Sequence, residues 1–403
     1  MQAVILAAGK SKRFYPLCEK SNKTMIPLLG KTILEWTILA LEKSGIKDIV
    51  LVVNPEGAAT LPPKRREPKP KIVIQEEAVG MADGLLKAKD EIHEDFFLLN
   101  GYHLDIDWFI KDMIAKKEKA DGVILATQRE NPWEFGVLEV VGDKVKSLVE
   151  KPARGSQASR LCVAGAYLLT KDFLPFLEKF PASHYQLEEA INKYCQEKNI
   201  LVQETAKPTI SLKHSWDLLK LKDYLLEKIP QVISKTAKIG KNVILEGKVI
   251  IEDGAMIMEN AVIKGPAYIG RNVLVGNSVL IRQGTVIEEN CQIGAFSEIK
   301  NSLFLPGAHF GGAGFIGSSI IGENCRLGHG FVSANKRFDR KKIMVSIKGE
   351  KIETGLDDLG VIMGNGVNVG IKVGTMPGKT IGSQATINPG AIVYEDVEDA
   401  FRG

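Results

Sequence analysis

The residues best suited to chemistry lie near the N-terminus, in a glycine turn that is rich in basic side chains. The apolar run 3–8 has the length and composition of a buried parallel strand, and it stops at Gly9. The basic residues Lys10, Lys12 and Arg13 follow this glycine, and Lys23 lies further along the same stretch. Backbone N–H groups in such a turn point toward a bound anion, and cations neutralise the charge that backbone dipoles leave. The stretch therefore predicts a phosphate-binding loop. It is not a P-loop, because Val4 stands where that motif requires glycine.

The whole string 3–31, AVILAAGKSKRFYPLCEKSNKTMIPLLGK, resembles the signature of the sugar-1-phosphate nucleotidyltransferases. The resemblance implies that Ala8 and Gly9 bind the nucleotide, that Arg13 contacts the triphosphate and that Lys23 contacts the phosphates. Such enzymes transfer a nucleotidyl group from a nucleoside triphosphate to a sugar 1-phosphate by in-line displacement at the α-phosphorus. Their catalysis rests on positioning and on cancelling developing charge, which Mg²⁺ and cationic side chains such as Arg13 and Lys23 supply.

Two further segments match the same family. The segment 75–84, QEEAVGMADG, is similar to the base-recognition segment, which implies that Gln75 and Gly80 read the nucleobase edge. The strings EFGVLEV and VEKP match the sugar-phosphate part of the family. They imply that Gly136 and Glu150 bind the sugar phosphate and that Lys151 is catalytic. The product would be UDP-N-acetylglucosamine or a related UDP- or dTDP-sugar.

Three positions depart from the family pattern, and two of them concern the metal. The family places one carboxylate after a strand-end Asn-Gly pair, where this chain has Tyr102, and a second ahead of the closing helix, where it has Ser211. Mg²⁺ prefers carboxylate oxygens, so a phenol and a hydroxyl are poor replacements. Asp105 and Asp107, which closely follow Tyr102, are the alternative candidates for metal ligands. An asparagine of the family's sugar site is replaced by Val163.

Length and composition bound the class of protein. A chain of 403 residues is too long for one core, so we expect two domains. Apolar residues make up 44% and charged residues 25%, as in soluble globular proteins, and the net charge of +4 is small. Five scattered cysteines without a C-x-x-C pair fit reduced thiols. Without a signal peptide or a membrane-length apolar run, we predict a cytoplasmic protein with no membrane or nucleic-acid partner.

Up to about residue 228 the apolar pattern alternates between strands and helices, which predicts a mostly parallel sheet covered on both faces. Ligands of such sheets bind beyond the carboxyl ends of the strands, where Gly9 and Gly101 fall. We therefore predict an α/β fold, with a Rossmann-like nucleotidyltransferase domain over 1–228. The Pro-rich, basic stretch 54–71 predicts a surface loop.

From residue 239 aliphatic side chains recur every six positions, which is typical of a parallel β-helix with one short strand per face. The residues with this period are Ile239, Leu245, Ile251, Ile257, Ile263, Ile269, Val275, Ile281, Ile287, Ile293, Ile299, Leu305, Ile321, Leu327, Met363, Val369, Thr375, Ile381, Ile387 and Val393. We predict this domain over 229–403, with 333–360 looping out or covering a neighbouring face. Similar hexapeptide-repeat helices are left-handed and form homotrimers, and the resemblance implies both properties here.

The order of the two domains resembles archaeal-type bifunctional enzymes that acetylate glucosamine 1-phosphate and then uridylylate the product. Acetyl transfer from acetyl-CoA needs a general base, usually histidine. The family's histidine position falls on Gly312, so His309 and His329 are the candidates for the base. Asn335 and Lys348 match polar positions of the family's acetyl-transfer pocket.

The sequence leaves three functional hypotheses open. The first is a working sugar-1-phosphate nucleotidyltransferase that uses Mg²⁺, with or without acetyltransferase activity that uses acetyl-CoA. The second is a degenerate, non-catalytic paralogue that binds a nucleotide or nucleotide-sugar as a regulatory or scaffolding partner; the replaced metal carboxylates and the replaced acetyl-transfer histidine favour it. The third is an acyltransferase in which only the β-helix is active.

Overall fold

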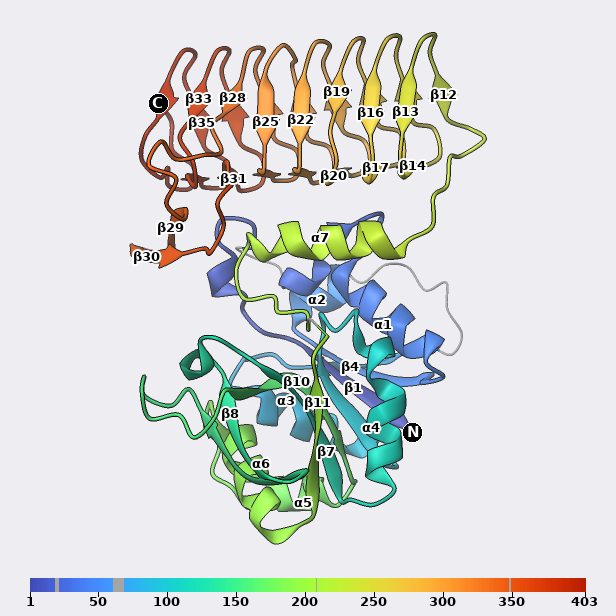
Figure 1. The fold of residues 1–403 in the computed structure, drawn as a ribbon, viewed down its shortest axis with the longest axis vertical. Helices are drawn as coiled ribbons and strands as arrows, with labels where there is room; N and C mark the ends of the chain where they lie inside the picture. The colour runs from blue at the N-terminus through green and yellow to red at the C-terminus, as the bar shows by residue number, and fades with distance from the viewer. Residues whose placement is uncertain (19–21, 61–68, 208, 348) are drawn as a thin grey trace. The chain divides into compact units, whose positions relative to one another are not determined.

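The computed structural model describes residues 1–18, 22–60, 69–207, 209–347 and 349–403. Contacts within the chain divide it into two compact units (Figure 1). The first unit holds the start of the chain up to Lys10, the segment that carries Lys23 and ends at Ile26, and the range from Thr32 to Ser211. The second unit holds everything from Leu212 onward, together with two short early segments that begin at Ser11 and at Pro27. The phosphate-loop sequence 3–31 therefore contributes to both units.

The first unit is built around a sheet with the strand order β5-β4-β1-β6-β10-β7-β11-β9-β8. Its strands are β1 (Gln2–Ala7), β4 (Asp48–Val53), β5 (Lys71–Ile74), β6 (Phe96–Asn100), β7 (Gly122–Gln128), β8 (Gly136–Val141), β9 (Lys144–Glu150), β10 (Leu161–Leu169) and β11 (Ile200–Thr205). Strands β5, β4, β1 and β6 are parallel. The carboxyl ends of these four strands therefore lie at one edge, as the sequence predicts. The prediction of a mostly parallel sheet is wrong for the other half, where β10 pairs antiparallel with β6 and β7, and β9 pairs antiparallel with β8 and β11.

Helices cover both faces of this sheet. The α-helices of the described residues are α1 (Ile33–Lys43), α2 (Pro55–Thr60), α3 (Met81–Lys87), α4 (Ile110–Lys117), α5 (Phe173–Leu177), α6 (Gln186–Glu197) and α7 (Asp217–Lys228). One core cluster contains residues of α1 and α4, and another contains residues of α3, α5 and α6. Helix α1 begins with a capping box, because the Thr32 hydroxyl accepts from the Glu35 N–H and the Glu35 carboxylate accepts from the Thr32 N–H.

The predicted surface loop over 54–71 is wrong at its start. Pro55–Thr60 forms helix α2, in which proline occupies the first helical position, where its missing N–H is not needed. The Asn54 side chain also accepts a hydrogen bond from the Gly57 N–H, as an N-cap residue does. Residues 61–68 lie outside the described residues.

The second unit contains a parallel β-helix with three sheets (Figure 1). The first sheet contains β12 (Lys238–Ile239), β15 (Met256–Ile257), β18 (Leu274–Val275), β21 (Gln292–Ile293), β24 (His309–Phe310), β27 (Arg326–Leu327), β32 (Asn368–Val369) and β35 (Thr386–Ile387). The second contains β13 (Ile244–Glu246), β16 (Val262–Lys264), β19 (Leu280–Ile281), β22 (Glu298–Lys300), β25 (Phe315–Gly317), β28 (Val332–Ser333), β33 (Gly374–Thr375) and β36 (Ile392–Val393). The third contains β14 (Val249–Ile251), β17 (Ala267–Ile269), β20 (Thr285–Ile287), β23 (Leu303–Phe304), β26 (Ile320–Ile321), β31 (Ile362–Met363) and β34 (Thr380–Ile381).

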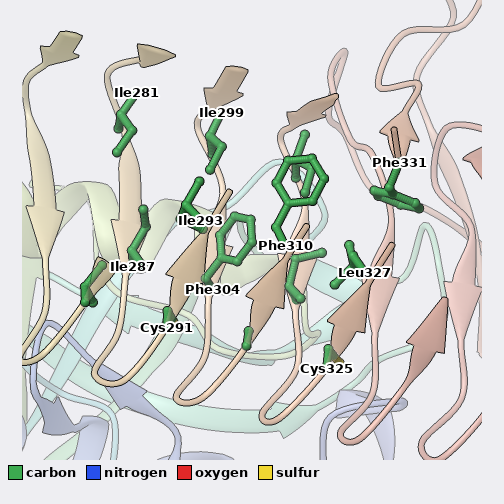
Figure 2. Packing of buried hydrophobic residues seen from close by; sticks show 14 of the residues in the cluster. Ile281, Ile287, Cys291, Ile293, Ile299, Phe304, Phe310, Cys325, Leu327 and Phe331 are labelled. Atoms are coloured by element: carbon green, nitrogen blue, oxygen red, sulfur yellow. The ribbon is translucent and has the colours of Figure 1, made fainter. Parts of the chain in front are cut away.

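The six-residue period is confirmed by the way the core is filled. From Ile251 onward most of the aliphatic residues of the period are buried in the coil and stack on their counterparts one turn away, for example Ile257 on Val275 and Ile263 on Ile281. Ile239, in the first turn, is exposed. Figure 2 shows this column of side chains, which also includes Cys291 and Cys325. Corners between strands use residues with positive φ, many of them asparagine, such as Asn260 and Asn290. Asparagine tolerates this left-handed backbone better than most residues.

The predicted period is wrong in one place, at Leu305. The core residue that pairs with Ile287 is Phe304, because five positions rather than six separate it from Ile299. The same shortening recurs one turn later, between Ile316 and Ile321. Both short repeats lie at the corner between the second and third sheets. Leu305 is itself buried and apolar, so the sequence pattern does not distinguish it from Phe304.

The segment 333–360 leaves the coil at this same corner, between β28 and β31. It contains an antiparallel hairpin of β29 (Met344–Ile347) and β30 (Glu350–Glu353). One side of the hairpin is apolar and buried, at Ile343 and Val345. Buried serine hydroxyls line the corner, where Ser319 Oγ donates to Gly317 O and lies 3.1 Å from Ser333 Oγ. Among the described residues, no helix has the length and apolar character needed to cross a membrane.

Candidate active site

The predicted phosphate loop is held together by a buried asparagine. Asn22 Nδ2 donates to the backbone O of Gly9 at 2.7 Å, just beyond the end of β1. The Asn22 side-chain oxygen accepts from the Thr24 N–H at 2.9 Å and caps the short turn Lys23–Met25. One side chain thus fixes the glycine turn against the turn that carries Lys23. Ala8 is buried behind this turn, whereas Gly9 is exposed.

Lys23 lies beside the end of β6, at the edge expected to bind ligands. Its Nζ is 4.8 Å from the centroid of the Tyr102 ring, a distance that allows a cation–π interaction. Gly101 is closely packed here: a Cβ on it would lie 3.0 Å from Thr24 Cγ2 and 3.3 Å from Ala7 Cβ. The structure therefore brings Gly9, Lys23 and Tyr102 to one edge of the sheet. Tyr102 occupies the position at which the family resemblance expects a metal carboxylate.

The two alternative metal ligands are engaged in other contacts. Asp105 is completely buried; its Oδ2 accepts from the Ile210 N–H at 2.9 Å, and its Oδ1 lies 3.4 Å from His103 Nδ1. Asp107 Oδ2 lies 3.4 Å from Lys43 Nζ. Ser211, the second family position, follows Ile210 directly and is half-buried. Within the described residues, no group of three or more His, Cys, Asp and Glu side chains is arranged to hold a metal ion.

An arginine that sequence reasoning missed lies on the same side of the site. Arg129 follows β7, and its Nη2 donates to Thr209 Oγ1 at 2.7 Å. Burial lowers the pKa of the Arg129 guanidinium, while the neighbouring Cys162, Tyr102 and Asp105 oppose this shift. A fixed positive charge thus stands near the place at which the family resemblance expects a metal ion. No local signal distinguishes this arginine, because its partner is 80 positions away in the sequence.

The predicted base-recognition residues, Gln75 and Gly80, are hydrogen-bonded to each other. Gln75 is buried at the end of β5, and its Nε2 donates to Gly80 O at 3.0 Å and to Asp83 Oδ2 at 2.7 Å. Its amide therefore fixes the turn that precedes α3. A Cβ on Gly80 would lie 3.1 Å from Ser183 O and 3.2 Å from His184 O, so the turn packs against the segment before α6.

The predicted sugar-phosphate residues form a second group. Gly136 pairs with Glu150 across β8 and β9, and a Cβ on Gly136 would lie 2.9 Å from Glu150 Oε2 and 3.5 Å from Val163 Cγ2. Lys151 Nζ lies 3.7 Å from Glu150 Oε1 and 5.5 Å from the Tyr185 ring centroid. The structure therefore brings together Gly136, Glu150, Lys151 and Val163, which replaces the family's asparagine.

Sequence reasoning also missed Glu188, in the first turn of α6. This side chain is buried, and among the described residues its Oε2 has no hydrogen-bond partner. Burial, and to a lesser degree the charge of Glu150, raises the pKa of Glu188 to about 7, while a backbone hydrogen bond and Lys151 oppose the shift. A buried carboxyl group thus adjoins the predicted sugar-phosphate residues. Its sequence signal is a glutamate on the apolar face of a helix, between Leu187 and Ile191.

The raised pKa of Glu188 predicts a pH-dependent stability. Between about pH 4.5 and about pH 7 the folded chain retains a proton that the unfolded chain loses, so the stability of the first unit falls as pH rises through this window. The full shift corresponds to about 3 kcal/mol. In Glu188→Gln the melting temperature should change less between pH 5 and pH 8 than in the wild type. Glu189→Gln, which changes the exposed neighbouring residue, is the matched control. An equal pH dependence of the melting temperature in Glu188→Gln and in the wild type would refute the raised pKa of Glu188.

Arg13 belongs to the second unit, in which two hydrogen bonds anchor the residues that closely follow it. The Ser215 hydroxyl donates to Tyr15 O at 3.4 Å, and the Ser383 hydroxyl of the β-helix donates to Pro16 O at 3.2 Å. Arg13 itself is exposed and lies in the middle of a short turn, Lys12–Phe14. Its assignment to the triphosphate rests on the family resemblance.

The predicted acetyl-transfer residues lie on different strands and corners of the β-helix. His309 lies on β24, between Gln292 and Arg326 of the neighbouring strands, and is half-buried. His329 is exposed at a corner, with Nδ1 3.3 Å from Gly311 O, and Asn335 follows β28 of another sheet. Lys348 lies outside the described residues. Gly312, at the family's histidine position, has φ +109° and no room for a Cβ, which would lie 2.6 Å from Ala295 O.

Comparison with known proteins identifies the family. The family model described as Nucleotidyl transferase matches residues 2–217, more than half of the chain. The chain belongs to the nucleotidyl transferase family. A second family model, described as the GMPPB C-terminal domain, matches residues 263–369.

Several archaeal members of this family match almost the entire chain. The bifunctional protein GlmU of Methanococcus maripaludis strain C7 is 38% identical over 402 residues, which cover 99% of this chain and 96% of that protein. A bifunctional sugar-1-phosphate nucleotidylyltransferase/acetyltransferase of Sulfurisphaera tokodaii is 33% identical over 408 residues, 98% of each chain.

Among solved structures, the UTP-bound UGPase of Acinetobacter baumannii has the same fold over 57% of this chain and 94% of its own, with a TM-score of 0.50 and 20% identity.

For a nucleotidyl transferase, the described metal side of this site is a poor fit to Mg²⁺. Mg²⁺ is usually held by one or two carboxylates and the substrate phosphates. Here a phenol and a hydroxyl occupy the expected positions, Asp105 is buried and hydrogen-bonded, and Arg129 adds a positive charge nearby.

Proposed function

We propose that the chain binds a nucleoside triphosphate and a sugar 1-phosphate, as a sugar-1-phosphate nucleotidyltransferase of the GlmU type. The reaction would yield a nucleoside diphosphate sugar and pyrophosphate, with UDP-N-acetylglucosamine or a related UDP- or dTDP-sugar as the product. The observation that carries this proposal is the bridge made by Asn22. It holds Gly9 and Lys23 together at the carboxyl edge of β1 and β6, where ligands of parallel sheets bind.

Each predicted residue has a role that its surroundings allow. The turn at Ala8 and Gly9 would hold the nucleotide, and the ammonium of Lys23 would contact its phosphates with the help of Arg13. Gln75 and Gly80 would shape the base-recognition turn. Gly136, Glu150 and Lys151 would hold the sugar 1-phosphate, which is the acceptor.

The second half of the chain is proposed to be an acyltransferase-like domain. Its coil would be left-handed and would assemble as a homotrimer, and its acetyl donor would be acetyl-CoA. His309 or His329 would act as the base, since Gly312 leaves no space for the family's histidine. We also propose the domain boundary at 228/229 and a cytoplasmic location. Limited proteolysis of the linker tests the boundary.

The replacement of the expected carboxylates on the metal side of the site favours a second function. A binding protein without turnover would need the phosphate loop but no metal carboxylates. The burial of Asp105 against the Ile210 N–H fits this role, as does the lack of space at Gly312. Such a chain would act as a nucleotide- or nucleotide-sugar-binding regulator or scaffold.

Pyrophosphate release separates these functions. The purified protein is given UTP or dTTP, Mg²⁺, and glucose-, glucosamine- or N-acetylglucosamine-1-phosphate. Turnover with any pair supports the enzyme. No pyrophosphate release with any pair, together with a nucleotide-induced rise in melting temperature, supports the binding protein. Absence of both turnover and binding overturns both.

The nucleotide-induced rise in melting temperature is expected to depend little on Mg²⁺. The cations that face the phosphates would be side chains, so chelating divalent ions removes little of the attraction. We expect the shift with UTP or dTTP in EDTA to remain within about twofold of the shift in millimolar Mg²⁺. A shift that appears only with Mg²⁺ would mean that Asp105 or Asp107 serves as a ligand after all.

A further inference from the structure

The phosphate-loop sequence ends in a tight hairpin that the β-helix holds. Strands β2 (Pro27–Leu28) and β3 (Lys31–Thr32) pair with each other and are joined by Leu29 and Gly30. Both joining residues have positive φ, +50° and +75°, as a two-residue hairpin turn of type I′ requires. Glycine adopts this backbone freely, but leucine does so at a cost, so the turn needs an external stabiliser at Leu29.

Glu288, which follows β20 of the β-helix, supplies that stabiliser. Its Oε1 accepts from the Leu29 N–H at 2.6 Å, and its Oε2 accepts from the Gly30 N–H at 3.0 Å. Consecutive N–H groups in this conformation form a concave nest that suits an anion. Glu288 is only 1% exposed. Tyr268 closes the other side, because a Cβ on Gly30 would lie 2.7 Å from its hydroxyl.

The hairpin is linked to Lys23 by a short and well-bonded connection. The Ile26 N–H donates to Lys23 O at 3.3 Å, and the Ile33 N–H donates to Ile26 O at 3.1 Å, which closes the base of the hairpin. Ile26 is itself buried. These hydrogen bonds constrain the connection between the tip at Leu29 and Gly30 and the backbone that carries Lys23.

We propose that Glu288 is a positioning residue for nucleotide binding: by fixing the Leu29–Gly30 turn, it sets the conformation of the segment that carries Lys23. This role rests on the proposed function, since it assumes that Lys23 contacts the phosphates. It makes triphosphate binding in the first half of the chain depend on a residue of the β-helix. Ser383, which bonds Pro16 on the other side of Lys23 in the sequence, is a second anchor of the same kind.

The experiment compares Glu288→Ala, Glu288→Gln and the full-length wild type. Amide hydrogen exchange of residues 22–34 reports the hairpin, and calorimetric titration reports the affinities for UTP or dTTP and for N-acetylglucosamine-1-phosphate. Glu288→Ala should speed exchange at Leu29 and Gly30 and raise the Kd for the nucleotide about tenfold, while the sugar-phosphate Kd stays within about twofold. Glu288→Gln, which keeps one acceptor oxygen, should lie between the wild type and Glu288→Ala.

Two controls separate positioning from loss of stability. Glu289→Gln removes a neighbouring charge whose carboxylate lies 3.7 Å from Arg271 Nη1, and it should behave as the wild type. Ile299→Ala destabilises the β-helix core and should leave the ratio of the two affinities unchanged. Equal weakening of both affinities in Glu288→Ala would indicate a merely structural residue and overturn the proposal.

The outcomes also distinguish this proposal from the proposed function. Faster exchange in Glu288→Ala with an unchanged nucleotide Kd overturns the positioning role and leaves the proposed function standing. Unchanged exchange overturns the clamp itself. A wild type that binds no nucleoside triphosphate overturns the proposed function and the positioning role with it, and the exchange data then still decide whether Glu288 holds the hairpin.

Discussion

Lys23→Ala is expected to weaken the binding of UTP or dTTP by about 10- to 100-fold, which corresponds to the loss of one or two charge-assisted hydrogen bonds. Lys23 lies at the carboxyl edge of the sheet, and Asn22 holds its turn against Gly9. The Lys23 ammonium lies over the face of the Tyr102 ring, and the melting temperature of the variant serves as the control for its fold. Isothermal titration calorimetry measures the effect.

The matched control is Lys47→Ala, an exposed lysine that directly precedes β4, at the opposite edge of the sheet. It should bind nucleotide as the wild type does. Lys23→Arg keeps the charge but changes its reach, and we expect a smaller loss than with alanine. Equal affinities for Lys23→Ala and Lys47→Ala would show that the phosphates bind elsewhere.

Tyr102→Asp combined with Ser211→Asp is expected to make nucleotide binding dependent on Mg²⁺ and to raise pyrophosphate release by about tenfold or more. The two substitutions restore carboxylates where the family resemblance expects them, and two carboxylates with substrate phosphates suit Mg²⁺. The positions belong to segments that are already connected, since Asp105 follows Tyr102 closely and binds the N–H of Ile210, the residue before Ser211. Rates are measured with and without Mg²⁺.

Each single variant should give less than the pair, because one carboxylate holds Mg²⁺ weakly. Tyr102→Phe is the control for loss of the phenol, and it should create no metal dependence. A double variant with no gain in turnover and no metal dependence would count against the alignment that places Ser211 at the second carboxylate position.

The sequence predicts the local features of this protein well. The turn at Gly9 and the strands that meet at one edge follow from apolar runs that end in glycine. The six-residue period predicts the coil, and it fails only where a one-residue shortening exchanges Leu305 for Phe304, both of them apolar.

The sequence cannot show where a charge is buried by residues far along the chain. Arg129 meets Thr209, and Glu288 meets Leu29, across 80 and 259 positions. Asp105 and Asp107 are attractive metal ligands by proximity to Tyr102, but distant partners occupy their oxygens. Pairings of this kind depend on the tertiary fold and leave no periodic or local trace.

The corner between the second and third sheets of the β-helix is the place at which the length of the repeats varies. Both shortened repeats and the excursion 333–360 fall at this corner, while the strands on either side keep their register. Serine hydroxyls there donate to backbone oxygens and accept from backbone N–H groups, as Ser319 does with Gly317 and Val361. Insertions and deletions can therefore accumulate at one seam without disturbing the stack. The same seam is the natural place to graft a reporter peptide or a binding loop onto the protein.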